Sequence, residues 1–308
     1  MPTFLILLAA WLLDRRFGEP RRLHPLNGFA ALASHTERWL NRPQLPAQTR
    51  RRLGQVALVM LLAPPAALTL VATLSPGGWL IELAILYLCL GGRSLAEHAR
   101  AIARPLQAGD LPGARSALVA VVSRDPTQLD ARGVATAATE STLENGNDAV
   151  FATLFWFLLA GAPGAVLHRL ANTLDALWGY RSQRYADFGR AAARLDDLLA
   201  WVPARLTAAT FALVSFRPGP VWQAVREQAP LWPGTNPGVV IASGAAALAT
   251  TLGGPAPYAE GVRERPTLGF SGHADSQTLL RATTLVERGV WIWIACAAAL
   301  WAPTPFGF

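Results

Sequence analysis

The most restrictive feature of this sequence is an uncharged apolar run from Leu53 to Leu74. A helix needs roughly 20 apolar residues to cross the hydrocarbon core of a bilayer, and this run has that length. Hydrophobic residues make up 52% of the chain and charged residues only 15%, against roughly 25% charged residues in a soluble domain. The chain therefore has too few charges to cover water-soluble domains and too much apolar surface to stay disordered. It is predicted to be an integral membrane protein.

Further apolar segments lie along the whole chain, at residues 4–13, 79–90, 149–159, 198–216, 236–252 and 290–301. Several are short for a complete span, so we expect between four and six spans. Residues 149–159 end at a Gly-Ala-Pro-Gly break and suggest a buried or re-entrant helix. No strand-like alternation is apparent. The predicted fold is all-α: a polytopic integral membrane helical protein with cytoplasmic polar helices and loops.

We expect residues 1–308 to form a single membrane-embedded helical domain. Its predicted parts follow one another along the chain: an N-terminal anchor and arginine-rich loop at 1–52, a helical hairpin at 53–91, catalytic polar segments with short buried helices at 92–207, and C-terminal helices at 208–308.

The arginines predict the orientation in the membrane. All 27 basic residues are arginine, and nine of them lie in the loop at residues 14–52. Because positive loops stay in the cytoplasm, we expect a multi-pass protein of the cell inner membrane with its polar loops on the cytoplasmic side. No positive residue precedes the apolar segment 4–13, which favours an uncleaved anchor over a signal peptide. A helix packed against the other spans is the alternative.

The absence of lysine excludes several kinds of chemistry. It rules out a Schiff-base lysine, a pyridoxal phosphate aldimine and the lysine of a phosphate-binding loop. The formal charge is +7, and arginine favours bidentate recognition of anions. Since the arginines lie in short loops between apolar runs, we expect phosphorylated small molecules as partners and no nucleic acid. The two cysteines, Cys89 and Cys296, form neither a disulfide framework nor a zinc site.

Three acids precede the apolar segment 149–159. Glu140, Glu144 and Asp148 are spaced i, i+4, i+8, so on a helix they fall within about 80° of arc. Like charges at this spacing repel each other, so the pattern is unfavourable unless a cation or arginines lie opposite. Mg²⁺ suits such carboxylates and often bridges to substrate phosphates. A solvated acidic face is the alternative.

A second polar segment covers residues 172–197, which we expect to be helical over much of its length. Arg181 and Arg184 are one helical turn apart and flanked by tyrosines, an arrangement that suits a phosphate or carboxylate group. Asn172, Asp175 and Gly179 would share one helical face. The alternative is a surface salt-bridge ladder of Asp187, Arg190, Arg194 and Asp197.

Two single residues complete the candidates. Arg205 lies inside an apolar segment, so it needs a buried acid or an anionic ligand; snorkelling to the interface is the competing explanation. His24 lies in a Gly-Glu-Pro and His-Pro turn, where a lone histidine is more often a hydrogen-bonded loop residue than a catalyst.

Together these segments resemble the adenosylcobinamide-phosphate synthase family of cobalamin biosynthesis, the CobD/CbiB family. The resemblance rests on motifs found in order along the chain: Leu13-Asp14, Gly18-Glu19-Pro20, His24-Pro25, Ser123-Arg124-Asp125, Leu129-Asp130, Glu140-Ser141, Glu144-Asn145, Asp148, Asn172-Thr173-Leu174-Asp175, Gly179-Tyr180-Arg181, Arg184-Tyr185, Phe188-Gly189, Ala193-Arg194-Leu195-Asp196-Asp197, Trp201 to Thr207, Asn236-Pro237-Gly238 and Leu252-Gly253-Gly254-Pro255 with Tyr258. Two positions depart from the family pattern, Glu19 for an aspartate and Pro237 for a small residue.

The resemblance implies an acid–amine ligase of the membrane. Such an enzyme joins a propionate carboxyl of adenosylcobyric acid to the amine of aminopropanol or its O-phosphate, with ATP as co-substrate and Mg²⁺ as cofactor. A homo-oligomer, or an assembly with other membrane enzymes of the pathway, is left open. The competing class is a membrane transporter or sensor for an anionic or corrinoid ligand, without chemistry.

The residue roles follow as expectations. The catalytic candidates are Glu140, Glu144, Asp175 and Asp197. The metal candidates are Glu140, Glu144, Asp148 and Asp196. The substrate-binding candidates are His24, Arg124, Asn172, Tyr180, Arg181, Arg184, Arg194 and Arg205.

Overall fold

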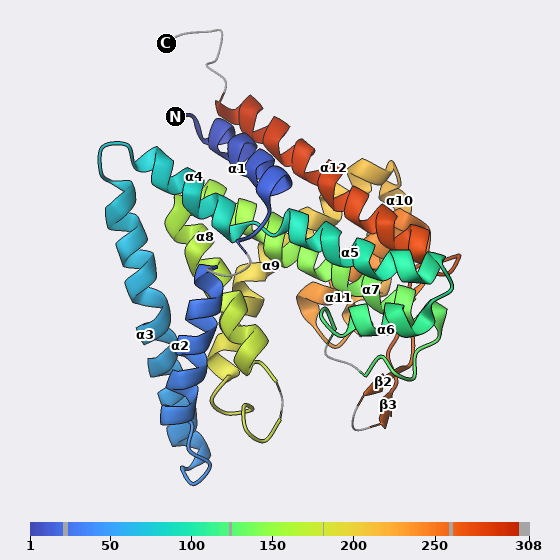
Figure 1. Cartoon of the computed structure of the whole chain (residues 1–308), viewed down its shortest axis with the longest axis horizontal. Coiled ribbons are helices and arrows are strands. Elements are labelled where there is room, and N and C mark those ends of the chain that lie inside the picture. Colours follow the sequence, from blue (N-terminus) through green and yellow to red (C-terminus); the bar gives the residue numbers. More distant parts are fainter. Residues whose placement is uncertain (21–23, 123–124, 181, 259–260, 302–308) are drawn as a thin grey trace. The chain divides into compact units, whose positions relative to one another are not determined.

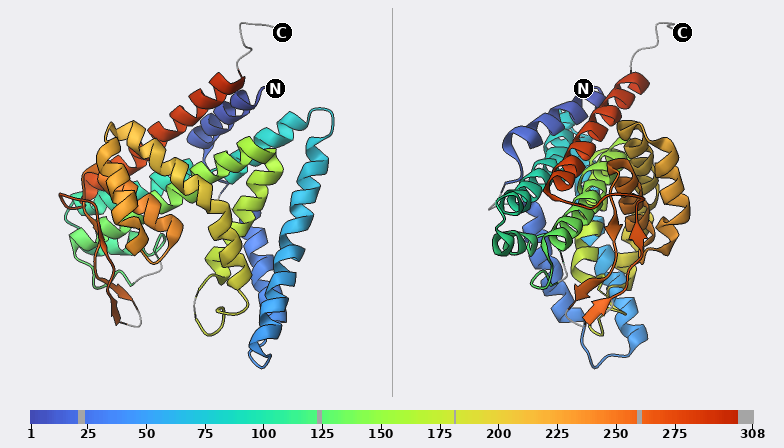
Figure 2. Two further views of the ribbon diagram at one scale, coloured as in Figure 1. Left: turned by 180° about the vertical axis from the view of Figure 1, so that it is seen from behind. Right: turned by 90° about the vertical axis from the view of Figure 1, so that its right-hand side faces the viewer.

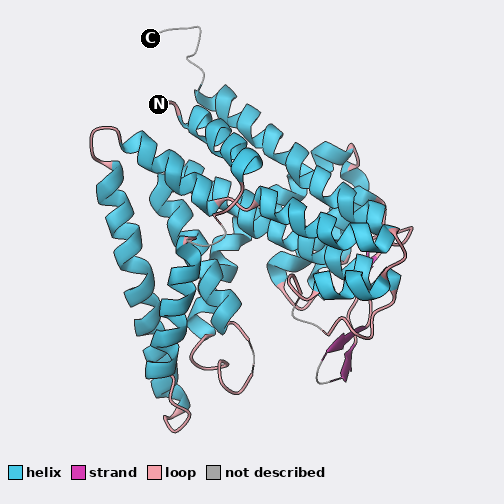
Figure 3. Cartoon of the chain, viewed as in Figure 1, coloured by secondary structure: helices cyan, strands magenta, loops and turns pink. Residues whose placement is uncertain are grey.

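The computed structural model describes residues 1–20, 24–122, 125–180, 182–258 and 261–301, with the backbone alone at 257, 258, 262 and 301. Helices dominate it (Figure 1, Figure 3), which confirms the all-α prediction. The α-helices are α1 (Thr3–Phe17), α2 (Pro25–Leu40), α3 (Ala47–Thr73), α4 (Gly78–Cys89), α5 (Gly92–Gln107), α6 (Leu111–Leu118), α7 (Ala131–Gly146), α8 (Ala152–Trp178), α9 (Arg190–Ser215), α10 (Pro218–Glu227), α11 (Thr235–Leu248) and α12 (Ser276–Trp301). A π-helix, η1 (Asn147–Phe151), joins α7 to α8, and a 3-10 turn, η2 (Ala229–Leu231), follows α10.

Five helical segments within the described ranges are long and apolar enough to cross a membrane, which agrees with the expected four to six spans and with a multi-pass protein. They are Ala47–Thr73, Gly78–Gln107, Ala131–Trp178, Arg190–Ser215 and Ser276–Leu300.

The chain forms two compact units, and it passes between them several times. The first unit comprises Met1–Gly91, Ala152–Ala200 and Ala297–Phe308; the second comprises Gly92–Phe151 and Trp201–Cys296.

In the first unit, α3 packs against α8 and α2, and α1 packs against α4 (Figure 1, Figure 2). The core between α3 and α8 is built from aliphatic and aromatic side chains, with Leu174, Trp178 and Phe188 fully buried. The apolar segment expected as an anchor is α1, a helix of 15 residues that buries Ile6, Leu7, Ala10 and Trp11. Since both an anchor and a helix packed against the other spans would bury one face, the two alternatives stay predictions.

The break expected after residue 159 is a kink rather than the end of a helix. Ala160 and Gly161 depart from helical geometry inside α8, and Gly161 has a φ of 63°. Glycine adopts this left-handed region without the steric penalty of a Cβ atom. The helix then resumes and continues to Trp178.

In the second unit, α7 packs against α5, α6 and α11, and α10 packs against α11. Helix α11 is almost completely buried. Two of its glycines allow close contacts, since a Cβ on Gly238 would lie 2.5 Å from the Ala229 carbonyl oxygen and one on Gly244 would lie 2.5 Å from Leu143. Small residues at helix contacts are typical of membrane proteins.

The second unit contains a few short strands in addition to its helices. Two short antiparallel pairs lie there, β1 (Leu252–Gly253) with β4 (Thr267–Leu268) and β2 (Ala256–Tyr258) with β3 (Gly261–Arg263). The hairpin of β2 and β3 is marked in Figure 1. Strands of two or three residues are too short to produce a visible alternation in sequence.

The expectation that residues 172–197 are helical over much of their length is confirmed at 172–178 and 190–197. Helix α8 ends at Trp178 and α9 begins at Arg190, so the described residues between them, 179–180 and 182–189, are not α-helical. Gly179 therefore lies beyond the helical face that carries Asn172 and Asp175.

Candidate active site

Glu140 is a buried carboxylate on α7. The helix begins after its N-cap residue Asp130, whose carboxylate accepts a hydrogen bond of 2.7 Å from the Gly133 amide. The Glu140 side chain is only 3% exposed. An isolated carboxylate at this depth would be strongly disfavoured by the loss of its hydration. Glu140 therefore requires a permanent partner.

Arg265 is that partner. Its Nη1 donates to Glu140 Oε2 at 3.0 Å and its Nη2 donates to Oε1 at 3.2 Å. The Gly253 amide donates to Oε1 at 2.8 Å. Because the Arg265 side chain is only 5% exposed, removing either member would leave an uncompensated charge in the interior, at a cost of about 3–5 kcal/mol.

Arg265 also fixes the Leu-Gly-Gly turn at residues 252–254. Its Nε donates to the Gly254 carbonyl oxygen at 3.1 Å, and its guanidinium carbon lies 4.9 Å from the centre of the Trp232 ring. Gly253 and Gly254 both have a φ of 80°. A Cβ on Gly253 would collide with the Pro266 carbonyl oxygen. The two glycines therefore allow the turn to bring its backbone up to Glu140.

A pocket of about 260 Å³ lies beside the Glu140–Arg265 pair. Its charged lining consists of two carboxylates and two guanidinium groups, from Glu140, Glu144, Arg263 and Arg265. Glu144 is half-buried and Arg263 is exposed. This combination suits a ligand that carries both a phosphate or carboxylate and a positive group, since each charge finds its opposite at the pocket wall.

A second pocket of about 300 Å³ shares Arg265 with the first. It lies at the start of α7, where Asp130, Arg132 and the turn glycines Gly253 and Gly254 line it. Arg265 therefore borders both pockets.

The predicted acidic face is only partly maintained. Glu140 and Glu144 line the first pocket, whereas Asp148 is not among the lining residues. The α-helical spacing ends before Asp148, because the π-helix η1 begins at Asn147. Asp148 Oδ1 accepts a hydrogen bond of 2.9 Å from the side-chain amide nitrogen of Asn147. Asn147 Oδ1 accepts one of 2.9 Å from the Thr207 hydroxyl.

The predicted metal ligands do not form an all-protein site. Among the residues that the structure describes, no group of three or more His, Cys, Asp or Glu side chains is close enough to hold a metal ion. Asp196 lies on α9, in the part of that helix that belongs to the first unit, whereas the acids of α7 belong to the second unit. Mg²⁺ has a weaker requirement, however, because one or two carboxylates together with substrate phosphates suffice. Glu144 at the first pocket fits that requirement, whereas both oxygens of Glu140 are bound by Arg265.

Arg205 has polar partners within the second unit. Its Nη1 donates to the Trp201 carbonyl oxygen at 2.7 Å and to Asn236 Oδ1 at 3.2 Å. Its guanidinium carbon lies 4.1 Å from the centre of the Trp201 ring. Asn236 belongs to the Asn-Pro-Gly motif, so two of the predicted motifs meet here. Ligand binding and snorkelling both remain open for Arg205.

The other candidates belong to the first unit. Asn172 and Asp175 lie on α8, Tyr180 and Arg184 lie between α8 and α9, and Arg194, Asp196 and Asp197 lie on α9. Arg124 and Arg181 lie outside the described residues. The predicted roles of all these residues stay predictions.

The proposed salt-bridge ladder does not run along one helix. Asp187 lies in the loop before α9, and its Oδ1 accepts a hydrogen bond of 2.7 Å from Arg51 on α3.

His24 is used at both ring nitrogens. Nδ1 accepts a hydrogen bond of 3.2 Å from the Leu26 amide, which caps α2, and Nε2 lies 3.1 Å from the Leu88 carbonyl oxygen. The ring is almost completely buried. These contacts match the hydrogen-bonded loop residue that was expected from sequence alone.

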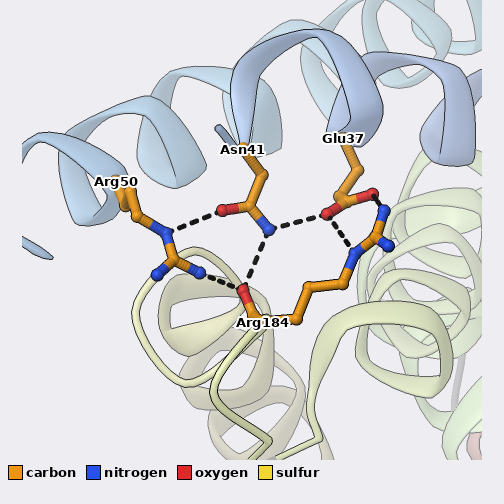
Figure 4. A network of polar contacts seen from close by, with 4 residues as sticks. All are labelled: Glu37, Asn41, Arg50 and Arg184. Atoms are coloured by element: carbon orange, nitrogen blue, oxygen red, sulfur yellow. Dashed lines mark hydrogen bonds and ion pairs between the residues drawn. The ribbon is translucent and has the colours of Figure 1, made fainter. Parts of the chain in front are cut away.

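Arg184 has an acidic partner that the sequence did not suggest. Its Nε and Nη2 donate to the two carboxylate oxygens of Glu37, at 3.0 and 2.6 Å (Figure 4). These hydrogen bonds, together with the carboxylate charge, raise the pKa of the Arg184 guanidinium above its ordinary value. An anionic ligand at Arg184 would have to share the guanidinium with Glu37.

Sequence reasoning missed Arg263, Arg265 and Trp232 in the second unit. One signal pointed toward Arg265. The acids of α7 repel one another unless arginines lie opposite, and the short arginine-containing segment after the Leu-Gly-Gly motif supplies them. In the first unit it also missed Glu37, Asn41 and Arg50, because their spacing in the sequence matches no pattern that predicts a contact.

Known proteins resemble the chain over nearly its whole length. The family model described as CobD/Cbib protein matches residues 7–286. A cobalamin biosynthesis protein CobD of Stutzerimonas stutzeri is 49% identical over 96% of each chain. Proteins of the same name from Chromobacterium violaceum and Rhodobacter capsulatus are 48% identical, over 97% of each chain, and 38% identical, over 91% of this chain and 90% of the relative.

No solved structure matches the chain at a significant level. The family model covers most of the chain, and the alignments to these relatives extend over nearly its whole length. This chain belongs to the CobD/Cbib family.

Proposed function

We propose that this chain is a membrane ligase of cobalamin biosynthesis. It would join a propionate carboxyl of adenosylcobyric acid to the amine of aminopropanol or its O-phosphate and so form adenosylcobinamide or its phosphate. Family membership and the names of its relatives support a role in cobalamin biosynthesis, and five apolar helical segments support a place in a membrane. The arginine-rich loops favour the inner membrane, with the active site on the cytoplasmic side.

The reaction requires activation of a carboxylate, which is a poor acyl donor. A carboxylate oxygen attacks the terminal phosphorus of ATP, ADP leaves, and an acyl phosphate forms. The amine then attacks the acyl carbon, loses a proton and expels phosphate, which leaves the amide. Both steps depend on positioning and on positive charge near the phosphate oxygens, rather than on a protein nucleophile.

The observation that carries this proposal is the pocket beside the Glu140–Arg265 pair. Arg263 and Arg265 supply positive charge for a phosphate group, and Glu144 supplies a carboxylate for the amine or for its proton. Arg265 is held in place by Glu140 and Gly254, so its charge is oriented before the substrate arrives. Preorganised charge of this kind is the main source of catalysis in phosphoryl and acyl transfer.

Mg²⁺ would bind mainly through the phosphate oxygens of the substrates. When bound, it would neutralise developing charge on the transferred phosphoryl group, and Glu144 is the carboxylate of this pocket that would help to hold it.

The test uses the purified full chain in lipid nanodiscs, with adenosylcobyric acid, ATP, Mg²⁺ and either aminopropanol or its O-phosphate. Mass spectrometry should find the amide product only when ATP is present. Proteoliposomes loaded with buffer provide the second arm: ATP-independent uptake of the corrinoid, without any amide, would support the transporter and contradict the ligase.

A further inference from the structure

The second pocket, at the start of α7, is lined by residues of the second unit alone. It encloses about 300 Å³, against about 260 Å³ for the first pocket. The proposed reaction brings together a corrinoid and two phosphate-bearing molecules, ATP and aminopropanol O-phosphate. A reaction with three substrates needs more binding space than the first pocket offers. The second pocket is the space beside it.

One side of α7 connects the two pockets. Four of its residues follow one another at intervals of four positions and so lie along one side of the helix: Arg132, Thr136, Glu140 and Glu144. Arg132 and Thr136 line the second pocket, whereas Glu140 and Glu144 line the first. The two pockets are therefore neighbours along the same helix.

Arg265 can serve both pockets at once. A guanidinium group has five N–H donors, and three of those of Arg265 donate to Glu140 and to the Gly254 carbonyl oxygen. The hydrogen bonds among the described residues leave its other two N–H groups without an acceptor. The Arg265 side chain is only 5% exposed, and a buried donor without an acceptor is costly. These two N–H groups therefore favour an acceptor bound in a pocket that Arg265 lines.

Arg132 supplies a second guanidinium group to the second pocket. Its side chain is exposed at the pocket, and none of the ion pairs among the described residues involves it. Asp130 is the one carboxylate among the described lining residues, and its Oδ1 caps α7 by accepting a hydrogen bond of 2.7 Å from the Gly133 amide. The charge of Arg132 is therefore available to an anionic ligand.

The remaining polar lining favours a phosphate group over a carboxylate. Three threonines line the second pocket: Thr136, Thr251 and Thr267. A phosphate ester has three strong acceptor oxygens, whereas a carboxylate has two. Two guanidinium groups and three hydroxyl groups offer more donors than a carboxylate can use, and arginine matches phosphate with paired hydrogen bonds.

We propose that the second pocket is a separate binding site for the phosphate group of a phosphate ester, with Arg132 and Thr136 as binding residues. This inference rests on the proposed function, in which ATP and aminopropanol O-phosphate are the two phosphate esters present. Because Arg265 borders both pockets, an ester held in the second pocket lies next to the reacting groups in the first.

Two variants test the site without disturbing the fold. Arg132→Gln removes an exposed charge that no described ion pair uses, and Thr136→Val removes a hydroxyl group at nearly constant shape. Arg226→Gln is the matched control. Arg226 is an arginine of the same unit, on α10, with a side chain that is 81% exposed, and it is absent from the described lining of both pockets.

The experiment measures equilibrium binding of each radiolabelled phosphate ester to the full chain in nanodiscs, with Mg²⁺ and without the corrinoid, so that no amide can form. Arg132→Gln should raise the Kd of one ester about tenfold or more, as expected for loss of hydrogen bonds from a charged group. The Kd of the other ester should stay unchanged, and this difference identifies which ester occupies the pocket. Thr136→Val should raise the Kd of the same ester about threefold. Arg226→Gln should match the wild type, and all variants should keep its unfolding temperature.

Three results would overturn the inference. Unchanged Kd values for both esters in Arg132→Gln would exclude the pocket, and equal weakening of both esters would exclude a separate site. Displacement of the bound ester by acetate as effectively as by inorganic phosphate would indicate a carboxylate site instead.

These binding measurements do not depend on turnover, so the inference and the proposed function can fail separately. A wild type that forms no amide but binds one ester through Arg132 would contradict the ligase and support the phosphate site. A wild type that forms the amide, with both Kd values unchanged in Arg132→Gln, would support the ligase and contradict the site. Failure of the wild type to bind either ester would also contradict the site.

Discussion

The guanidinium of Arg265 forms a bidentate ion pair with the carboxylate of Glu140, which lies 125 residues earlier in the sequence. Both side chains are almost completely buried. This ion pair joins α7 to the segment that follows the Leu-Gly-Gly turn. It also forms part of the wall of the pocket to which we assign the chemistry.

Breaking the pair on one side should be more damaging than removing it entirely. Arg265→Gln should destabilise the protein by about 3–5 kcal/mol, because Glu140 is left as a buried charge. The double variant Glu140→Gln with Arg265→Gln should recover a large part of that loss but no activity. Thermal unfolding in detergent measures the stabilities. Equal unfolding temperatures for the single and double variants would show that the pair is not coupled.

Glu144 should matter for turnover and not for folding. It is half-buried at the pocket, and Glu144→Gln keeps its shape while removing its charge. Amide formation should fall at least a hundredfold, the scale expected for loss of a general base or of a phosphate-site carboxylate. Insertion and unfolding temperature should be unchanged. Glu227→Gln is the matched control, since Glu227 is an exposed glutamate of the same unit on α10. Normal turnover in Glu144→Gln would remove this residue from the site.

The two turn glycines should differ in their sensitivity to alanine. Both have a φ of 80°, which disfavours any residue with a Cβ atom by roughly 1–2 kcal/mol. A Cβ on Gly253 would in addition collide with the Pro266 carbonyl oxygen, whereas the space beside Gly254 is open. Gly253→Ala should therefore lower the unfolding temperature clearly more than Gly254→Ala. The opposite ranking would mean that the turn does not approach β4 as described.

Asp275 should make the start of α12 sensitive to acid. Its Oδ1 accepts hydrogen bonds from the Thr278 amide and hydroxyl, each at 2.7 Å. Burial is the largest single influence on its pKa and raises it, but the hydrogen bonds from Thr278 and the charge of Arg281 together outweigh burial and lower the pKa.

A lowered pKa in the folded state means that the stabilising effect of Asp275 is complete above the ordinary value of 3.8. The effect is lost as the pH falls below that value through the folded-state pKa. Asp275→Ala should cost about 1 kcal/mol at pH 7, the usual value for a helix cap. The difference from the wild type should shrink below pH 4. A difference that does not depend on pH would exclude the ionised cap.

The sequence predicted the helices well because apolar runs of this length have few other solutions in a membrane. It predicted the polar contacts less well. Glu140 was recognisable from the spacing of its acidic neighbours, but Arg265 lies in a segment without periodicity, and only the folded chain brings the two together. The segment 172–197 was expected to be helical over much of its length, but the position of the interruption between Trp178 and Arg190 was not predicted. A Cβ on Gly189 would collide with the Trp178 carbonyl oxygen, so the backbone approaches the end of α8 there too closely for a side chain.

The predicted acidic face brings Glu140 and Glu144 to one pocket, and Asp148 is not among its lining residues. Helical spacing placed all three acids on one face, but α7 ends at Gly146 and the π-helix η1 begins at Asn147, before Asp148. Single-residue insertions into a helix of this kind leave no compositional signal.

The most direct test of the account follows the oxygen atoms of the corrinoid carboxyl group. Adenosylcobyric acid labelled with ¹⁸O in the reacting propionate is incubated with the wild-type protein, ATP, Mg²⁺ and aminopropanol O-phosphate, and the released phosphate is analysed by mass spectrometry. The account predicts one ¹⁸O atom in inorganic phosphate for each amide formed, with ADP as the nucleotide product. Amide formation without label in phosphate, or label in AMP, would contradict the acyl phosphate route, and the absence of any amide would contradict the ligase itself.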